Sequence, residues 1–121
     1  MEMPFEAILH ELTERSGASG AVLLGADGDM VASFTASPAL EMDLIGAHHG
    51  VILNIVRDAA ERLDEGPVKA ISITTGASRI TVCSLKEDLC LVLVMKRQAQ
   101  PGKALMESRR AIVRIEKELG C

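Results

Sequence analysis

Hydrophobic and polar positions recur with two different periods along the chain, and each change of period marks a new element. Apolar side chains recur every three or four residues over positions 5–12, which indicates a short amphipathic helix that ends at Gly17. Two strands follow, Gly20 to Leu24 and Met30 to Phe34, and the Asp27-Gly28 dipeptide between them is typical of a tight turn. The sequence therefore begins with a helix and a β-hairpin.

The second half of the chain predicts a long helix, three strands and a last helix. The long helix should begin between Pro38 and Asp43 and end near Leu63, before Asp64-Glu65-Gly66-Pro67. The last helix should begin at Pro101. Between them, short apolar runs separated by turn residues predict strands at residues 68–75, 79–85 and 89–95.

The run from Leu89 to Met95 is apolar at every position. A strand without a polar side is typical of one buried on both faces, so this strand should be central, with helices on both faces of the sheet. The order α-β-β-α-β-β-β-α predicts a fold of the α/β (α+β) class, with a five-stranded antiparallel sheet in a single domain over residues 1–121.

Composition and charge exclude several functions. The net charge is -4, and the two aromatic residues are both Phe. A nucleic-acid binder or a membrane-surface protein normally carries a basic patch, so we expect neither nucleic acid nor membrane as a partner. The first fifteen residues are acidic and no apolar run approaches the ~18 residues of a membrane span, so a cytoplasmic location is expected.

The long helix carries two different arcs when its residues are projected at 100° per residue. One arc is aliphatic and is predicted to cover the sheet. The opposite arc centres on Gly46 and Gly50, each of which costs a helix about 1 kcal/mol relative to Ala. These glycines either relieve a crowded contact within the monomer or let a partner helix approach, and the second interpretation is preferred. The aliphatic arc contains Leu44, Val51, Ile52, Ile55, Val56, Ala59 and Leu63, and the opposite arc contains Asp43, Gly46, Gly50, Leu53, Asn54 and Arg57.

The strand after the long helix would present a mild, uncharged edge with Ser72, Thr74 and Thr75. An unprotected edge strand can pair with another chain. A close-approach helix beside an open edge favours self-association.

Other residues offer chemistry that a structural role explains better. His48 and its neighbour His49 point about 100° apart on a helix and cannot easily share a metal, and Asp27-Gly28-Asp29 lacks the other ligands of a calcium loop. A two-residue turn would set Cys83 opposite Cys90 and permit a disulfide, but two buried reduced thiols are the preferred interpretation. Cys121 is expected to be exposed. No cofactor or metal site is predicted.

The order and spacing of these elements resemble the roadblock/dynein light chain domain family. The resemblance rests on Ser16-Gly17-Ala18-Ser19-Gly20 leading into the first strand, on Asp27-Gly28, and on the small-residue strand Met30-Val31-Ala32-Ser33. The long helix, the three-strand meander and the closing helix complete it, from about Phe5 to Leu119. The resemblance implies that the long helix covers one face of the sheet and the two terminal helices cover the other.

The resemblance also implies a homodimer that regulates a Ras-like small GTPase, as bacterial relatives of the MglB type do. It implies that paired long helices and merged edge strands join the two chains, and it transfers no catalytic motif, so no enzyme activity is expected. A scaffold without nucleotide dependence and a small-molecule sensor remain alternatives, because fold does not fix function. The interface residues expected are Gly46, Gly50, Leu53, Asn54, Arg57, Ala70, Ser72 and Thr74.

Arg109, Arg110 and Arg114 cluster on the last helix. A GTPase activator could use such an arginine to offset charge on the transferred phosphoryl group. A solvated face balanced by neighbouring glutamates, among them Glu107 and Glu116, is the preferred interpretation.

Overall fold

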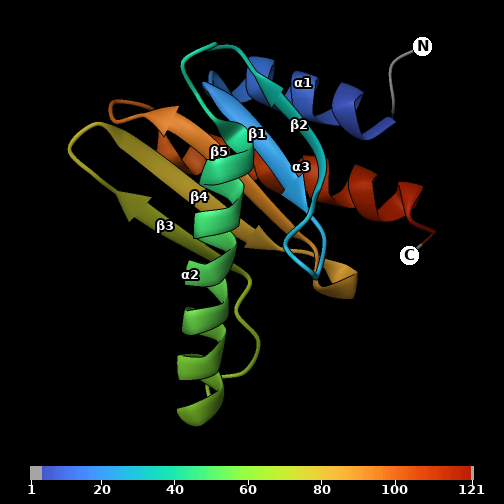
Figure 1. The fold of residues 1–121 in the computed structure, drawn as a ribbon, viewed down its shortest axis with the longest axis vertical. Helices are drawn as coiled ribbons and strands as arrows, with labels where there is room; N and C mark the ends of the chain where they lie inside the picture. Colours follow the sequence, from blue (N-terminus) through green and yellow to red (C-terminus); the bar gives the residue numbers. More distant parts are fainter. Residues whose placement is uncertain (1–3, 121) are drawn as a thin grey trace.

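The computed structural model describes residues 4–120 and places one sheet between a long helix and a pair of terminal helices (Figure 1). The α+β class and the order α-β-β-α-β-β-β-α are confirmed. The elements are α1 (Pro4–Ser16), β1 (Gly20–Leu24), β2 (Met30–Thr35), α2 (Met42–Arg62), β3 (Ala70–Thr74), β4 (Ser78–Ser84), the short 3-10 helix η1 (Lys86–Asp88), β5 (Cys90–Lys96) and α3 (Pro101–Glu118).

The five antiparallel strands lie in the order β2-β1-β5-β4-β3, so β5 is central and β2 and β3 form the two edges. In β5 the six residues from Cys90 to Met95 are buried, as its continuous apolar run predicts. Because β5 pairs with both β1 and β4, residues far apart in the sequence meet in the middle of the sheet.

Alternate residues of the strands build two cores, one on each face of the sheet. On the side of α1 and α3 the core includes Leu9, Leu23, Leu93 and Ile115. On the side of α2 it includes Val22, Val92 and Leu53. Figure 1 shows α2 crossing one face, with α1 and α3 together on the other. The arrangement of the helices expected from the family resemblance is thus present.

The turns have local causes. In the first hairpin, Gly28 takes a φ of 87°, and the Asp29 amide donates to Asp27 Oδ1 at 3.1 Å. That hydrogen bond from Asp29 holds the pKa of the Asp27 carboxyl below its usual value. These contacts support a hairpin turn at Asp27-Gly28.

Across residues 4–120, no helix is both long and apolar enough to cross a membrane.

Candidate functional site

The helix α2 turns its glycines toward its own sheet. Gly46 is buried, and a Cβ added there would lie 3.0 Å from Leu24 Cδ2 and 3.1 Å from Val22 Cγ1. Real Cβ contacts are rarely that short, so the close approach of α2 to β1 depends on the missing side chain. Gly50 is less constrained, since its added Cβ would meet Leu24 Cδ1 at an ordinary 3.5 Å.

Two further residues fix the same face of α2 against the sheet. The Leu53 side chain is 1% exposed and belongs to the core under α2. Arg57 donates to Ser84 Oγ of β4 at 2.9 Å and to Asn54 Oδ1 at 3.3 Å. This contact to β4 ties the second half of the helix to the strand beneath it.

These contacts overturn the sequence-based assignment of the two arcs of α2. Gly46 and Leu53 were expected to face a partner, and both face the monomer's own sheet. Gly46 relieves a crowded contact within the chain, which was the alternative interpretation, whereas Gly50 meets only an ordinary contact there. Gly50 and Arg57 are half-buried on the same side, and Asn54 is exposed. The number of aliphatic residues on each arc predicted the wrong orientation of α2, because the arc with fewer aliphatic residues is the one that packs closely on the sheet.

The opposite arc of α2 is instead an exposed aliphatic stripe. We define it by four side chains that are about half exposed or more: Leu44 (49%), Val51 (59%), Ile55 (63%) and Leu63 (71%). The separations of 7 and 4 residues place Leu44, Val51 and Ile55 on one side of the helix, and Leu63 follows directly after its last residue, Arg62. A contiguous apolar patch of this kind typically marks a protein interaction site.

The two neighbouring histidines of α2 differ in their surroundings. His48 is exposed, while His49 Nδ1 lies 2.7 Å from the Ile45 carbonyl oxygen.

The strand β3 provides a second exposed feature at the edge of the sheet. Ala70, Ser72 and Thr74 are exposed, while Ile71 and Ile73 pack partly against the core under α2. The strand contains neither proline nor a charged residue, the usual devices that protect an edge. The structure thus places the predicted uncharged strand at an edge, and pairing with another chain remains a prediction.

A groove of about 650 Å³ opens along the flank of α2, between the β1–β2 turn and the start of β5. Its lining includes Ala47 and Gly50 of α2 together with three carboxylates, Asp27, Asp58 and Asp88. Among the residues that the structure describes, no three His, Cys, Asp or Glu side chains converge as they would around a metal ion.

The cysteines correct the predicted hairpin register. The turn between β4 and β5 contains η1, so Cys83 pairs with Leu91 and Cys90 pairs with Ser84. Cys83 lies in the core under α1 and α3, and Cys90 lies in the core under α2, so the two thiols are on opposite faces and cannot form the disulfide considered above. Burial raises the pKa of each thiol to about 11. Cys121 lies outside the described residues.

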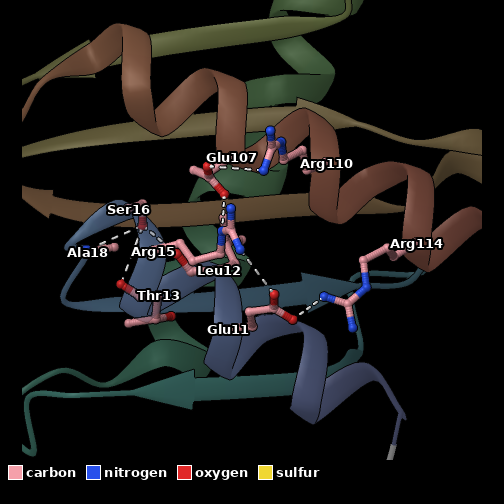
Figure 2. A network of polar contacts seen from close by, with 9 residues as sticks. All are labelled: Glu11, Leu12, Thr13, Arg15, Ser16, Ala18, Glu107, Arg110 and Arg114. Carbon is pink, nitrogen blue, oxygen red and sulfur yellow. Dashed lines mark hydrogen bonds and ion pairs between the residues drawn. The ribbon is translucent and has the colours of Figure 1, made fainter.

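A network of ion pairs joins α1 to α3 on the far side of the sheet (Figure 2). Arg15 Nε donates to Glu107 Oε2 at 2.9 Å, and Arg114 of α3 pairs with Glu11 of α1. The Arg114 guanidinium holds the pKa of the Glu11 carboxyl below its usual value. Glu11 and Glu107 balance Arg15, Arg110 and Arg114, whereas Glu116 accepts a hydrogen bond from the Lys86 amide.

Solved structures with this arrangement share the fold at low sequence identity. MglB from Myxococcus xanthus superposes with a TM-score of 0.88 at 12% identity, covering 96% of this chain and 94% of that chain. A Roadblock/LC7 domain from Streptomyces avermitilis gives 0.86 at 20% identity, with 96% and 98% covered. An MglB with a tetrameric arrangement gives 0.81 at 22% identity, with 93% and 87% covered.

Among curated protein sequences, none matches this chain significantly. The family model of the Roadblock/LC7 domain, in contrast, matches residues 4–95, which run from α1 into β5. That match covers most of the chain and includes both α2 and the edge strand β3. The chain therefore belongs to the Roadblock/LC7 domain family.

Proposed function

We propose that this chain is a non-catalytic homodimeric interaction module that binds and regulates a Ras-like small GTPase. The observation that carries the proposal is the exposed aliphatic stripe of α2. The stripe lies on the arc of α2 opposite the one that faces the sheet, so the fold of a single chain leaves it open to water. Such a surface favours association with a second protein chain.

In the proposed dimer, the stripes of two α2 helices pack against each other and the β3 edges of the two chains meet. The exposed residues Asn54, Ala70, Ser72 and Thr74 remain in this interface from the sequence-based set. The stripe residues Leu44, Val51, Ile55 and Leu63 take the place of four residues on the side of α2 that faces the sheet: Gly46 and Leu53, which are buried, and Gly50 and Arg57, which are half-buried. Isologous packing of this kind uses the same patch on both chains, so one stripe suffices for closure. The tetrameric arrangement named for one related MglB supports self-association.

Membership of the Roadblock/LC7 family and the likeness to MglB structures support a GTPase as the partner of the dimer. The dimer would offer a composite surface that a single chain lacks. Arg109, Arg110 and Arg114 lie on α3, in the layer opposite α2. We therefore expect any stimulation of GTP hydrolysis to come from repositioning the GTPase's own residues rather than from these arginines.

The proposal is tested by capture from native-host lysate on the immobilised protein, with GDP in one arm and a non-hydrolysable GTP analogue in the other. Enrichment of one small GTPase in one nucleotide state, identified by mass spectrometry, is the expected result. Ile55→Asp should abolish the capture, while Val113→Asp, the same kind of change at an equally exposed aliphatic residue on the opposite face, should retain it. Capture of other proteins regardless of nucleotide would replace the regulator with a structural scaffold.

A further inference from the structure

The outer side of the α1–α3 layer is hollowed in two adjoining places. One hollow of about 380 Å³ lies between the two helices, over Ile8, Leu12 and Ala111. The second, of about 360 Å³, lies along α3 beside Gly102 and Leu105. Arg110 and Val113 line both hollows, so they form one continuous surface, which we call the α3 face.

Two apolar side chains stand out of the α3 face. Val113 is 65% exposed and Met106 is 50% exposed. They are seven residues apart, so they lie on the same side of α3 and about 10.5 Å apart along its axis. That spacing equals the i to i+7 repeat of another helix. A helix lying along α3 could therefore place apolar residues against Met106 and Val113 at once.

The charge around these apolar residues is mostly positive, on a chain whose net charge is -4. Arg15, Arg109, Arg110 and Arg114 line the hollows, together with only two carboxylates. Glu107 is held by Arg15, with Arg110 at a longer 4.0 Å, and Glu11 is held by Arg114 (Figure 2). The local carboxylates are thus already paired, which leaves Arg109 and most of the Arg110 guanidinium available for an outside acid.

We propose that the α3 face docks an acidic amphipathic helix of a partner protein. The partner helix would carry apolar residues at i, i+3 or i+4, and i+7, with Asp or Glu flanking them. Arginine and methionine are favoured at protein interfaces, and planar guanidinium groups bind carboxylates in a directed way. The two glutamates on this face and the absence of aromatic side chains make it a poor match for a lipid surface or a nucleic acid.

This site is separate from the proposed GTPase site, because α1 and α3 lie on the face of the sheet opposite α2 (Figure 1). Loss of one should leave the other intact. A variant that disables the α2 stripe should still dock the acidic helix, so failure of one proposal is distinguishable from failure of the other.

The test is a selection of displayed random peptides, about 16 residues or four to five helical turns long, on the wild-type protein. Peptides rich in Asp and Glu, with apolar residues at the stated spacing, should be enriched. A synthetic copy of the most enriched peptide, labelled for fluorescence anisotropy, should bind Val113→Asp and Arg110→Glu at least about tenfold more weakly than wild type. Val113 is well exposed, so the melting temperature of Val113→Asp should stay unchanged. Arg110→Glu also loses the 4.0 Å contact to Glu107, so its melting temperature should fall slightly but stay well above the assay temperature.

The matched control Lys69→Glu makes the same charge change as Arg110→Glu, before β3, and should bind the peptide as wild type does. Enrichment of basic peptides would overturn the proposal, and so would binding of the peptide by Val113→Asp and Arg110→Glu with wild-type affinity. Sedimentation of the protein with phosphatidylserine vesicles, lost in Arg110→Glu, would overturn it in favour of a membrane surface. A fall in oligomeric mass caused by Val113→Asp would overturn it in favour of a second copy of this chain.

Discussion

The two faces of the sheet are closed in different ways. On one face, five of the 13 residues of α1 are buried and five of the 18 of α3, and ion pairs join the two helices. On the other face, α2 alone covers the sheet, and only Met42, Gly46 and Leu53 are buried among its 21 residues. The first face is completed by its own chain, whereas the second leaves much of its helix exposed.

That difference teaches where to look for a partner. Although α2 buries few of its residues, it exposes three large aliphatic side chains on one side, with Leu63 just beyond its end, which a helix with a purely solvent-facing role does not need. We infer that α2 has two packing tasks. One is the contact of Gly46 and Leu53 with the sheet, and the other is the contact of the exposed stripe with a second chain.

The largest expected effect comes from cutting the contact between α2 and the sheet. Leu53→Ala should lower the free energy of unfolding by about 2–5 kcal/mol, because it leaves a cavity in the core under α2. Ile55→Ala, two residues away on the exposed stripe, should cost far less at protein concentrations low enough to keep the chain monomeric. Urea unfolding measures both. Equal losses would show that the two faces of α2 are not distinct.

The glycines of α2 sharpen the same comparison. Gly46→Leu should destabilise the protein by about 1–3 kcal/mol, because the side chain would have to enter the space held by Leu24 and Val22. Gly50→Ala meets only an ordinary contact and should stabilise the helix by up to about 1 kcal/mol. Thermal unfolding of the pair of variants provides the measurement. A stabilising Gly46→Leu would place this face of α2 away from the sheet.

The ion pairs test how firmly the opposite face is closed. Arg15→Ala should cost about 1–3 kcal/mol, since it removes the hydrogen bond to Glu107, whose side chain is only 7% exposed. Arg114→Ala removes a pair whose two side chains are both about half exposed, and should cost less than Arg15→Ala. Chemical denaturation of both variants gives the comparison. A larger loss of stability for Arg114→Ala than for Arg15→Ala would mean that the exposed pair, not the buried one, joins α1 to α3.

The two buried thiols, Cys83 and Cys90, lie in different cores, so their reactivity measures how tightly each face of the sheet is closed. Burial raises the pKa of Cys83 and Cys90 to about 11 from 9.0, so the stability that depends on their neutral form is complete below pH 9 and declines as the pH rises toward 11. At pH 8 both should resist thiol reagents in the folded protein. In an Ile55→Asp background, mass spectrometry should find Cys90, under α2, labelled before Cys83. Earlier labelling of Cys83 would contradict the assignment of the looser face.

The sequence predicted most of the fold because its local signals are strong. The Asp27-Gly28 turn, the stop at Gly66-Pro67 and the fully apolar run from Leu89 to Met95 each have one plain structural meaning. The bounds of β1 match the prediction at both ends, and the other elements differ by a few residues. Order and spacing were enough to suggest the family that the sequence match then established.

The orientation of α2 could not be predicted in the same way. Periodicity shows that a helix has two arcs, but the side that faces the sheet depends on how closely the backbone must approach Val22 and Leu24. A glycine in the middle of a helix, here Gly46, is a signal for such a close approach, but the sequence does not show whether the approaching surface is the chain's own sheet or a partner. The pairing of Arg15 with Glu107 joins residues 92 positions apart and leaves no trace in local spacing.

The central claim is that the exposed stripe of α2 joins two chains, and sedimentation equilibrium tests it most directly. The wild-type protein should sediment with twice the mass of the 12.9 kDa chain. Ile55→Asp should sediment as a folded monomer with an unchanged far-UV circular dichroism spectrum, because Ile55 is 63% exposed and does not support the fold. A wild-type monomer, or an Ile55→Asp protein that still dimerises with wild-type affinity, would contradict the account.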